Sequence, residues 1–220
     1  MRNVAGAEVA RTPPSASTAA LQRVIRRPFD RGGAAGQHCD MCAAPIPERH
    51  RHVLDEQRDE LMCTCQACTL LFQRDAAGRG HYRLVPDQRV RLPEFSPHDL
   101  GIPVGLAFFT ARSGGSVLAH YPSPMGATQW EVDHAAWSRM QGRCPELGEL
   151  VPGVQALLVN TARGAREHWI VPIDDCYRLV ALVRGEWKGL SGGSQVWPAI
   201  ERFFADLAAS PGSPLRKTRT

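Results

Sequence analysis

The chain has 220 residues with a formal net charge of +4, and 43% of its residues are hydrophobic. This length suits one globular domain with a small additional module, and the composition is ordinary for a globular protein. The longest apolar run, GIPVGLAFFTA at 101–111, is about half of what a bilayer span needs, so we expect no membrane segment.

The basic charge lies at the two ends of the chain. Residues 1–31 carry six arginines and two carboxylates, and the last ten residues add three basic side chains, which leaves the middle slightly acidic. Residues 1–35 and 210–220 are rich in small residues, proline and arginine, and we predict disordered tails there. The start of the chain lacks the pattern of a secretory signal, and seven cysteines in two tight clusters with two strays do not form a disulfide framework. We therefore expect a reducing, cytoplasmic location.

Two pairs of cysteines define a metal module over residues 37–75. Both pairs have the CxxC spacing, and 22 residues separate the first pair from the second. Two residues between cysteines let both thiolates face one ion, and two such pairs supply the four sulfurs of a tetrahedral zinc site. We predict that the ligands are Cys39, Cys42, Cys65 and Cys68.

The segment between the pairs predicts a hairpin. RHVLD at 51–55 and ELMCT at 60–64 read as short strands around a polar turn, which brings one cysteine pair up to the other. About forty residues cannot stabilise themselves by apolar burial alone, so the ion is expected to make this zinc-ribbon-like fold possible.

Three further potential ligands, His50, His52 and Cys63, lie in the same hairpin. Residues two apart in a strand share a face, so the two histidines are predicted to point the same way, and Cys63 lies on the facing strand. Three interpretations remain open. The side chains are solvated, or they form hydrogen bonds around the thiolates, or one of them replaces a cysteine ligand.

The ion is expected to be structural zinc, because a closed set of four cysteines leaves no position for a reactant. A rubredoxin-type iron uses the same four sulfurs and transfers one electron, so iron is the alternative. The CxxC turns of a rubredoxin-type iron site are usually accompanied by Gly or Pro residues. These are absent from CDMCA and CQACT, which favours zinc. Residues 37–75 hold four arginines and seven carboxylates, and this acidic balance opposes specific nucleic-acid binding.

Residues 76–100 contain several prolines and are predicted to be a connector. Beyond them, an α+β domain is predicted over residues 101–209. Apolar runs flank TARSGG at 110–115 and again TARGAR at 161–166, which indicates two hairpins. Helical patterns follow at 132–140, 174–187 and 196–209. The order ββαββαα predicts a mostly antiparallel, four-stranded sheet with helices on one face.

The second helical pattern also carries a candidate nucleophile. Cys176 lies in its first turn, where the helix dipole favours a thiolate, and three histidines are candidate partners, His120, His134 and His168. A Cys176-dependent enzyme is therefore one alternative. Asp174 and Asp175 are acidic candidates, but Asp174 also fits the helix N-cap, and we expect no catalytic residue.

LSGGSQ at 190–195 is similar to the signature of transporter ATPases, but the chain has no phosphate-binding P-loop motif to complete a nucleotide site. We predict an ordinary loop between two helices there.

Several of these stretches together resemble an uncharacterised, mainly actinobacterial protein family. They include CDMCAAPIPERHRHV, CTCQACTLLF, YPSPMGAT and ALLVNTARGAREHWIVPIDDCYRLVALVR, and the resemblance covers about 38–205. Members of that family are encoded among NiFe hydrogenase genes, alongside maturation proteins. The resemblance implies an accessory protein that assists hydrogenase assembly through contacts with hydrogenase subunits or maturation factors. We expect the partner to meet residues 161–179, and the rival function is a rubredoxin-like one-electron carrier.

Overall fold

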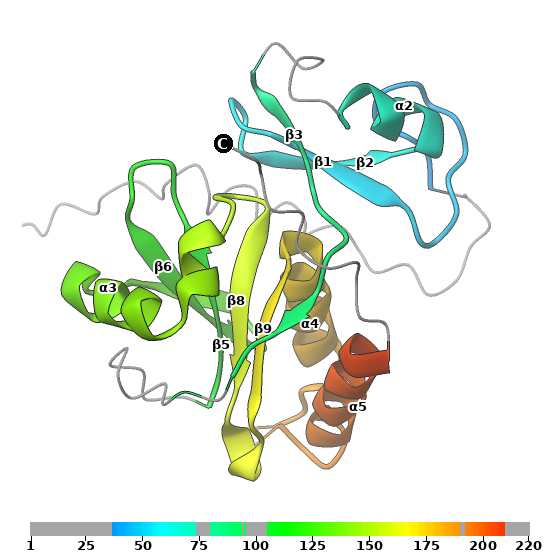
Figure 1. The fold of residues 1–220 in the computed structure, drawn as a ribbon. Coiled ribbons are helices and arrows are strands. Elements are labelled where there is room, and N and C mark those ends of the chain that lie inside the picture. The colour runs from blue at the N-terminus through cyan, green and yellow to red at the C-terminus, as the bar shows by residue number, and fades with distance from the viewer. Residues whose placement is uncertain (1–36, 74–79, 94, 96–104, 190–191, 210–220) are drawn as a thin grey trace, which may run out of the picture.

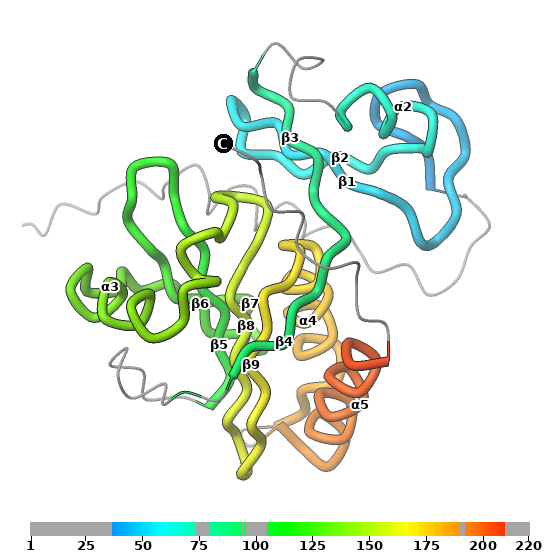
Figure 2. Tube along the Cα trace, viewed as in Figure 1, coloured from blue at the N-terminus to red at the C-terminus, as the bar shows by residue number. Residues whose placement is uncertain are grey.

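The structure is a computed structural model that describes residues 37–73, 80–93, 95, 105–189 and 192–209. It contains two antiparallel sheets, a small one of order β2-β1-β3 and a large one of order β4-β9-β8-β5-β6-β7 (Figure 1). The small sheet and α2 lie at one end of the large sheet, as the chain path in Figure 2 shows. The predicted α+β class is confirmed, and the two predicted tails lie outside the described residues.

The small sheet contains the predicted hairpin. Its strands are β1 (Arg51–Asp55) and β2 (Glu60–Thr64), which pair with His52 opposite Cys63. Asp55 stabilises the turn between them, because its Oδ1 accepts hydrogen bonds from the backbone N–H groups of Gln57 and Arg58. The strand boundaries predicted from the sequence are therefore those of the structure.

A segment predicted as a connector contributes a strand to each sheet. β3 (Tyr82–Leu84) pairs with the free edge of β1, and β4 (Val90–Arg91) pairs with β9 (Glu167–Pro172). Residues 80–93 therefore join the two sheets by backbone hydrogen bonds as well as by chain connection.

The large sheet has six strands where four were predicted. The predicted four form its middle, and they are β5 (Leu106–Ala111), β6 (Val117–Ser123), β8 (Gln155–Asn160) and β9. The edge strands β4 and β7 (Gly126–Glu131) were missed. β7 has the sequence GATQWE, in which small and polar residues replace the apolar alternation that predicts a half-buried strand.

Helices cover both faces of this sheet, and the expectation of one covered face is wrong. Phe108 belongs to the core beneath α4 (Ile173–Glu186) and α5 (Val196–Ala209), whereas its neighbour Phe109 packs with α3 (His134–Arg143) on the other side. All six residues of β8 are buried, as in a strand that is covered on both faces. Its sequence, QALLVN, is accordingly a nearly continuous apolar run.

Shorter helices occupy the connections. They are α2 (Gln66–Leu71) and the 3-10 turns η2 (Pro145–Glu149) and η3 (Ala162–Gly164). Residues 192–195 form the turn before α5, so the predicted loop is confirmed there, whereas Leu190 and Ser191 lie outside the described residues. Among the described residues, every helix is too short or too polar to reach across a bilayer.

The region expected to meet a partner is partly core and partly surface. Within residues 161–179, β9 has five buried residues out of six and lies between β4 and β8. Cys176 and Leu179 of α4 are also fully buried. Arg163 and Arg178 of the same region are exposed, so a partner contact there stays a prediction.

The small sheet packs onto the large one through Leu54. This side chain of β1 is 7% exposed and belongs to the same core as Phe108 and Val154. Gly153 lies so close that a Cβ there would be 2.8 Å from Leu54 Cδ2. Two ion pairs reinforce the junction, because Arg89 Nε lies 2.6 Å from Asp175 Oδ2 and His52 Nδ1 lies 3.0 Å from Asp174 Oδ2.

Shortening Leu54 tests this packing. We expect Leu54→Ala to lower the free energy of unfolding by about 2–5 kcal/mol, because it removes buried methyl groups and leaves a cavity between the sheets. Urea denaturation measures the change. The control, Leu71→Ala, removes a side chain that is 59% exposed and should change stability by about 0.5 kcal/mol or less. Equal effects of the two variants would contradict the junction described here.

Candidate metal centre

The first cysteine pair lies on a tight turn before β1. The N–H of Cys39 donates to the carbonyl of Ala44, and the N–H of Ala43 donates back to the carbonyl of Cys39, both at 2.8 Å. Asp40 ties this turn to β2, because its N–H donates to the Cys63 carbonyl and its Oδ2 accepts from the Cys63 N–H at 2.6 Å. The turn therefore holds Cys39 and Cys42 beside the end of β2.

The second pair lies at the start of α2. Cys65 is the N-cap of this helix, and its Sγ accepts a hydrogen bond from the backbone N–H of Cys68 at 3.4 Å. Thr69 packs the helix back on β2, because its Oγ1 lies 3.2 Å from Thr64 Oγ1 and donates to the Cys65 carbonyl. The helix thus fixes Cys65 and Cys68 on one side.

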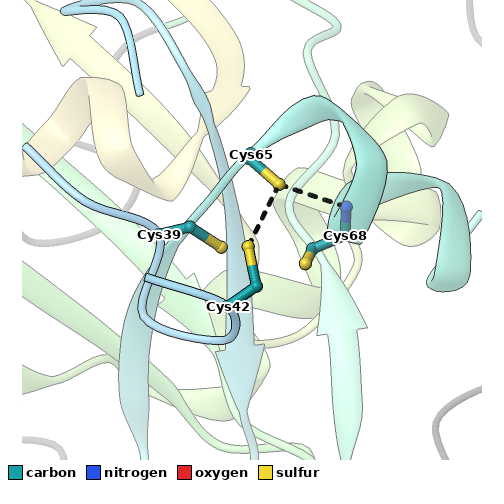
Figure 3. Close-up of side chains that lie close together, drawn as sticks. All are labelled: Cys39, Cys42, Cys65 and Cys68. Atoms are coloured by element: carbon teal, nitrogen blue, oxygen red, sulfur yellow. Dashed lines mark hydrogen bonds between the residues drawn. The ribbon is translucent and has the colours of Figure 1, made fainter. Parts of the chain in front are cut away.

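The four predicted ligands come together in the structure. Their sulfur atoms all lie within 4.8 Å of one another and point toward a common centre (Figure 3). Cys42 Sγ and Cys65 Sγ are 3.7 Å apart. A tetrahedral zinc ion with bonds of about 2.3 Å holds its sulfurs about 3.8 Å apart, so this donor set fits such an ion. All four cysteines are free thiols.

The crowded thiols oppose each other's ionisation. The hydrogen bond with the Cys42 side chain, followed by burial, raises the pKa of Cys68 to about 12. Burial also acts to raise the pKa of Cys39, but hydrogen bonds from backbone N–H groups outweigh it and lower the pKa to about 6. The backbone hydrogen bonds thus favour a thiolate at Cys39. A cation is needed before all four cysteines can be deprotonated together.

His50, His52 and Cys63 form a second group, separate from the four sulfurs. One ligand atom from each of them lies within 4.8 Å of the others. As predicted, the two histidines share a face of the hairpin and Cys63 faces them from β2. The four cysteines meet without any of these side chains, so the geometry does not require a substitute ligand.

His52 connects this group to the large domain. Burial acts to lower the pKa of His52, but hydrogen bonds with Asp174 and Cys63 outweigh it and raise the pKa to about 9. The expectation that Asp174 caps α4 is wrong, because the helix begins at Ile173 after Pro172, with no side-chain cap. Asp174 instead faces the hairpin and accepts from His52.

The structure does not favour a thiolate at Cys176, on which the enzyme alternative depends. Its side chain is 0% exposed within the core beneath α4, and burial raises its pKa well above the ordinary value. The candidate partners lie elsewhere. His120 Nε2 is 2.8 Å from Thr110 Oγ1, His134 begins α3 on the other face of the sheet, and His168 packs against Phe95. This arrangement does not support a nucleophilic Cys176.

A hollow of about 370 Å³ lies where the two sheets meet. Leu54 and Phe108 supply apolar walls, and His120 and Tyr177 supply polar groups. Burial, assisted by the charge of Arg112, lowers the pKa of His120 to about 4, so its ring is neutral near pH 7. No cysteine is among the described residues that line this hollow, which is therefore separate from both ligand groups.

Sequence reasoning missed the features that position the second cysteine pair and the first turn. The helix α2 has six residues, too few for helical periodicity to reveal it. Asp40 lies inside CDMC, and no sequence pattern predicts that its carboxylate accepts a hydrogen bond from the backbone N–H of Cys63. The available signal was Thr69, because a hydroxyl four residues after a capping Cys65 can return to that residue's carbonyl.

Residues 38–211 match the model of a family of unknown function, DUF5947, and the chain belongs to this family. No curated protein and no solved structure matches the chain.

Removing one sulfur tests the centre. We expect Cys65→Ser to abolish metal binding at the four-cysteine site and to unfold residues 38–73, since a bound zinc ion contributes about 10–16 kcal/mol to folding in modules of this kind. Hydrogen–deuterium exchange should show this module exposed while β8 and β9 remain protected. Cys176→Ser is the control and should leave the metal content unchanged. A fully protected module in the Cys65 variant would contradict the prediction.

Proposed function

We propose that this protein is a metal-binding accessory protein in which Cys39, Cys42, Cys65 and Cys68 hold structural zinc. The convergence of the four sulfurs carries this proposal. Four protein ligands complete the coordination of zinc, so no position remains for a substrate. The ion's task is then to hold the turn at 39–44, the end of β2 and the start of α2 in one arrangement.

The module needs such support because its own apolar interior is small. Among the described residues of its N-terminal half, the buried hydrophobic side chains include Cys39, Ile46, Val53 and Leu54. Leu54 already belongs to the core shared with the large sheet. The cysteine turn and α2 lie away from that junction, and metal ligation is the interaction best suited to fix them (Figure 1).

We propose that the surface held in this way contacts a protein. Leu70 and Leu71 of α2 are 58% and 59% exposed, and they follow directly after the ligand Cys68. Exposed leucines beside each other are typical of a protein interface and are unfavourable in water. The acidic balance of residues 37–75 and the thiolates disfavours a nucleic acid at the same place.

The resemblance to proteins encoded among NiFe hydrogenase genes supports the choice of partner. On that basis, the protein assists assembly or maturation of a hydrogenase by binding one of its subunits or maturation factors. A cytoplasmic location, where such assembly takes place, is part of the same proposal.

A one-electron carrier is the second candidate, because the sulfur positions fit ferric or ferrous iron as well as zinc. Cys42 is exposed, which would give a partner access to the centre. Colour separates the two. Zinc gives a colourless protein, and we expect that result from the full chain purified anaerobically; a red protein that dithionite bleaches would replace the zinc proposal with the iron one.

The partner contact is tested at α2. We expect Leu70→Ser with Leu71→Ser to weaken capture of hydrogenase subunits by about tenfold or more, because the pair supplies apolar contact area. Metal content should not change. Met125→Ser is the control, since Met125 is 93% exposed on a different surface. Normal hydrogen uptake in a strain that lacks this protein would overturn the hydrogenase role.

A further inference from the structure

We propose that His50, His52 and Cys63 form a second metal site, which binds a divalent ion such as Zn²⁺ and keeps one coordination position open. The three ligand atoms lie within 4.8 Å of one another. Two imidazoles and a thiolate are donors that zinc and neighbouring divalent ions accept. The site is independent of the structural role proposed for the four cysteines.

The strand register brings the three side chains together. His52 and Cys63 are directly opposite each other in the β1–β2 pair, and His50 lies two residues before His52 on the same face. The histidine rings have centroids 4.6 Å apart, at an angle of 54°. In a tetrahedral zinc site, the nitrogen and sulfur ligand atoms are about 3.3–3.6 Å apart. Side-chain rotation would bring the three atoms from their present spacing, within 4.8 Å, to these distances.

The hydrogen bonds of both histidines orient them as ligands. His50 Nδ1 lies 2.9 Å from the Pro47 carbonyl, and His52 Nδ1 lies 3.0 Å from Asp174 Oδ2. When each Nδ1–H donates to an oxygen, Nε2 is the ring atom left to bind a metal ion, and at His52 the ion displaces the Nε2 proton. Metal-binding histidines in proteins have this same arrangement, with a carbonyl or carboxylate behind the ring.

His50 adds an independent observation. Its Nε2 is buried and has no hydrogen-bond partner among the described residues. A buried ring nitrogen without a partner is unfavourable, and a metal ion would supply the partner. The alternative, that the histidines support the four thiolates, is not favoured, because their hydrogen bonds run to Pro47 and Asp174 instead.

The site differs in chemistry from the four-cysteine centre. Within the described part of the chain, no fourth histidine, cysteine, aspartate or glutamate shares the spacing of the three. All three side chains are half-buried, so solvent reaches the group. A zinc ion with three protein ligands carries water or another small ligand in its fourth position, as catalytic zinc ions do.

Metal stoichiometry of the full chain tests the proposal. The metal-free protein is titrated with Co²⁺ under anaerobic conditions, and we expect two equivalents to bind. His50→Gln with Cys63→Ser should bind one, and its absorption should keep the charge-transfer bands of a four-thiolate centre. His81→Gln, at a histidine directly before β3, is the matched control and should bind two. A wild type that binds one equivalent, or a double variant that binds two, overturns the second site.

Two further measurements keep the proposal testable if the double variant fails to fold. In the ¹⁵N-labelled wild type, the second equivalent of Zn²⁺ should shift the Nε2 resonances of His50 and His52 while both Nδ1 atoms stay protonated. Unchanged Nε2 resonances overturn the proposal. Asp174→Asn should lower the affinity for the second equivalent of Zn²⁺ about 10–100-fold and leave the affinity for the first unchanged, because Asp174 orients His52 without binding the metal.

Discussion

The convergence of four sulfurs at one point is the constraint on which the N-terminal half of this molecule depends. One pair arrives on the turn at 39–44, and the other arrives on the first turn of α2. The hydrogen bond with Cys42 raises the pKa of Cys68, so the crowded thiols oppose ionisation without a cation. The same ion that neutralises the thiolates would also fix the helix that presents Leu70 and Leu71.

The junction between the sheets is organised by the first turn of α4. Asp174 and Asp175 follow each other in sequence but have different partners, His52 of the hairpin and Arg89 of the joining segment. Arg89 binds both oxygens of Asp175, which is 2% exposed, so this pair is shielded from water. One helix terminus therefore anchors the metal module and its connecting strand on the large domain, with Leu54 as the apolar contact.

The sequence predicted those parts of the fold that depend on residues close together in the chain. The two CxxC pairs gave the cysteine cluster, and the apolar runs around polar turns gave the hairpins of both sheets. Edge strands were missed because β4 has two residues and β7 lacks a regular apolar alternation. The role of Asp174 could not be predicted, because sequence proximity to a helix start does not reveal which side chain caps the helix and which one faces another sheet.

Differential alkylation of the native protein, read by mass spectrometry, tests the central claim most directly. If one cation is bound by Cys39, Cys42, Cys65 and Cys68, these four thiols resist a small alkylating reagent together and become reactive together once a chelator removes the metal. Cys42 is the most informative of the four, because it is exposed and burial does not protect it. Rapid alkylation of Cys42 before chelation, or disulfides linking the four cysteines in pairs, would contradict the account.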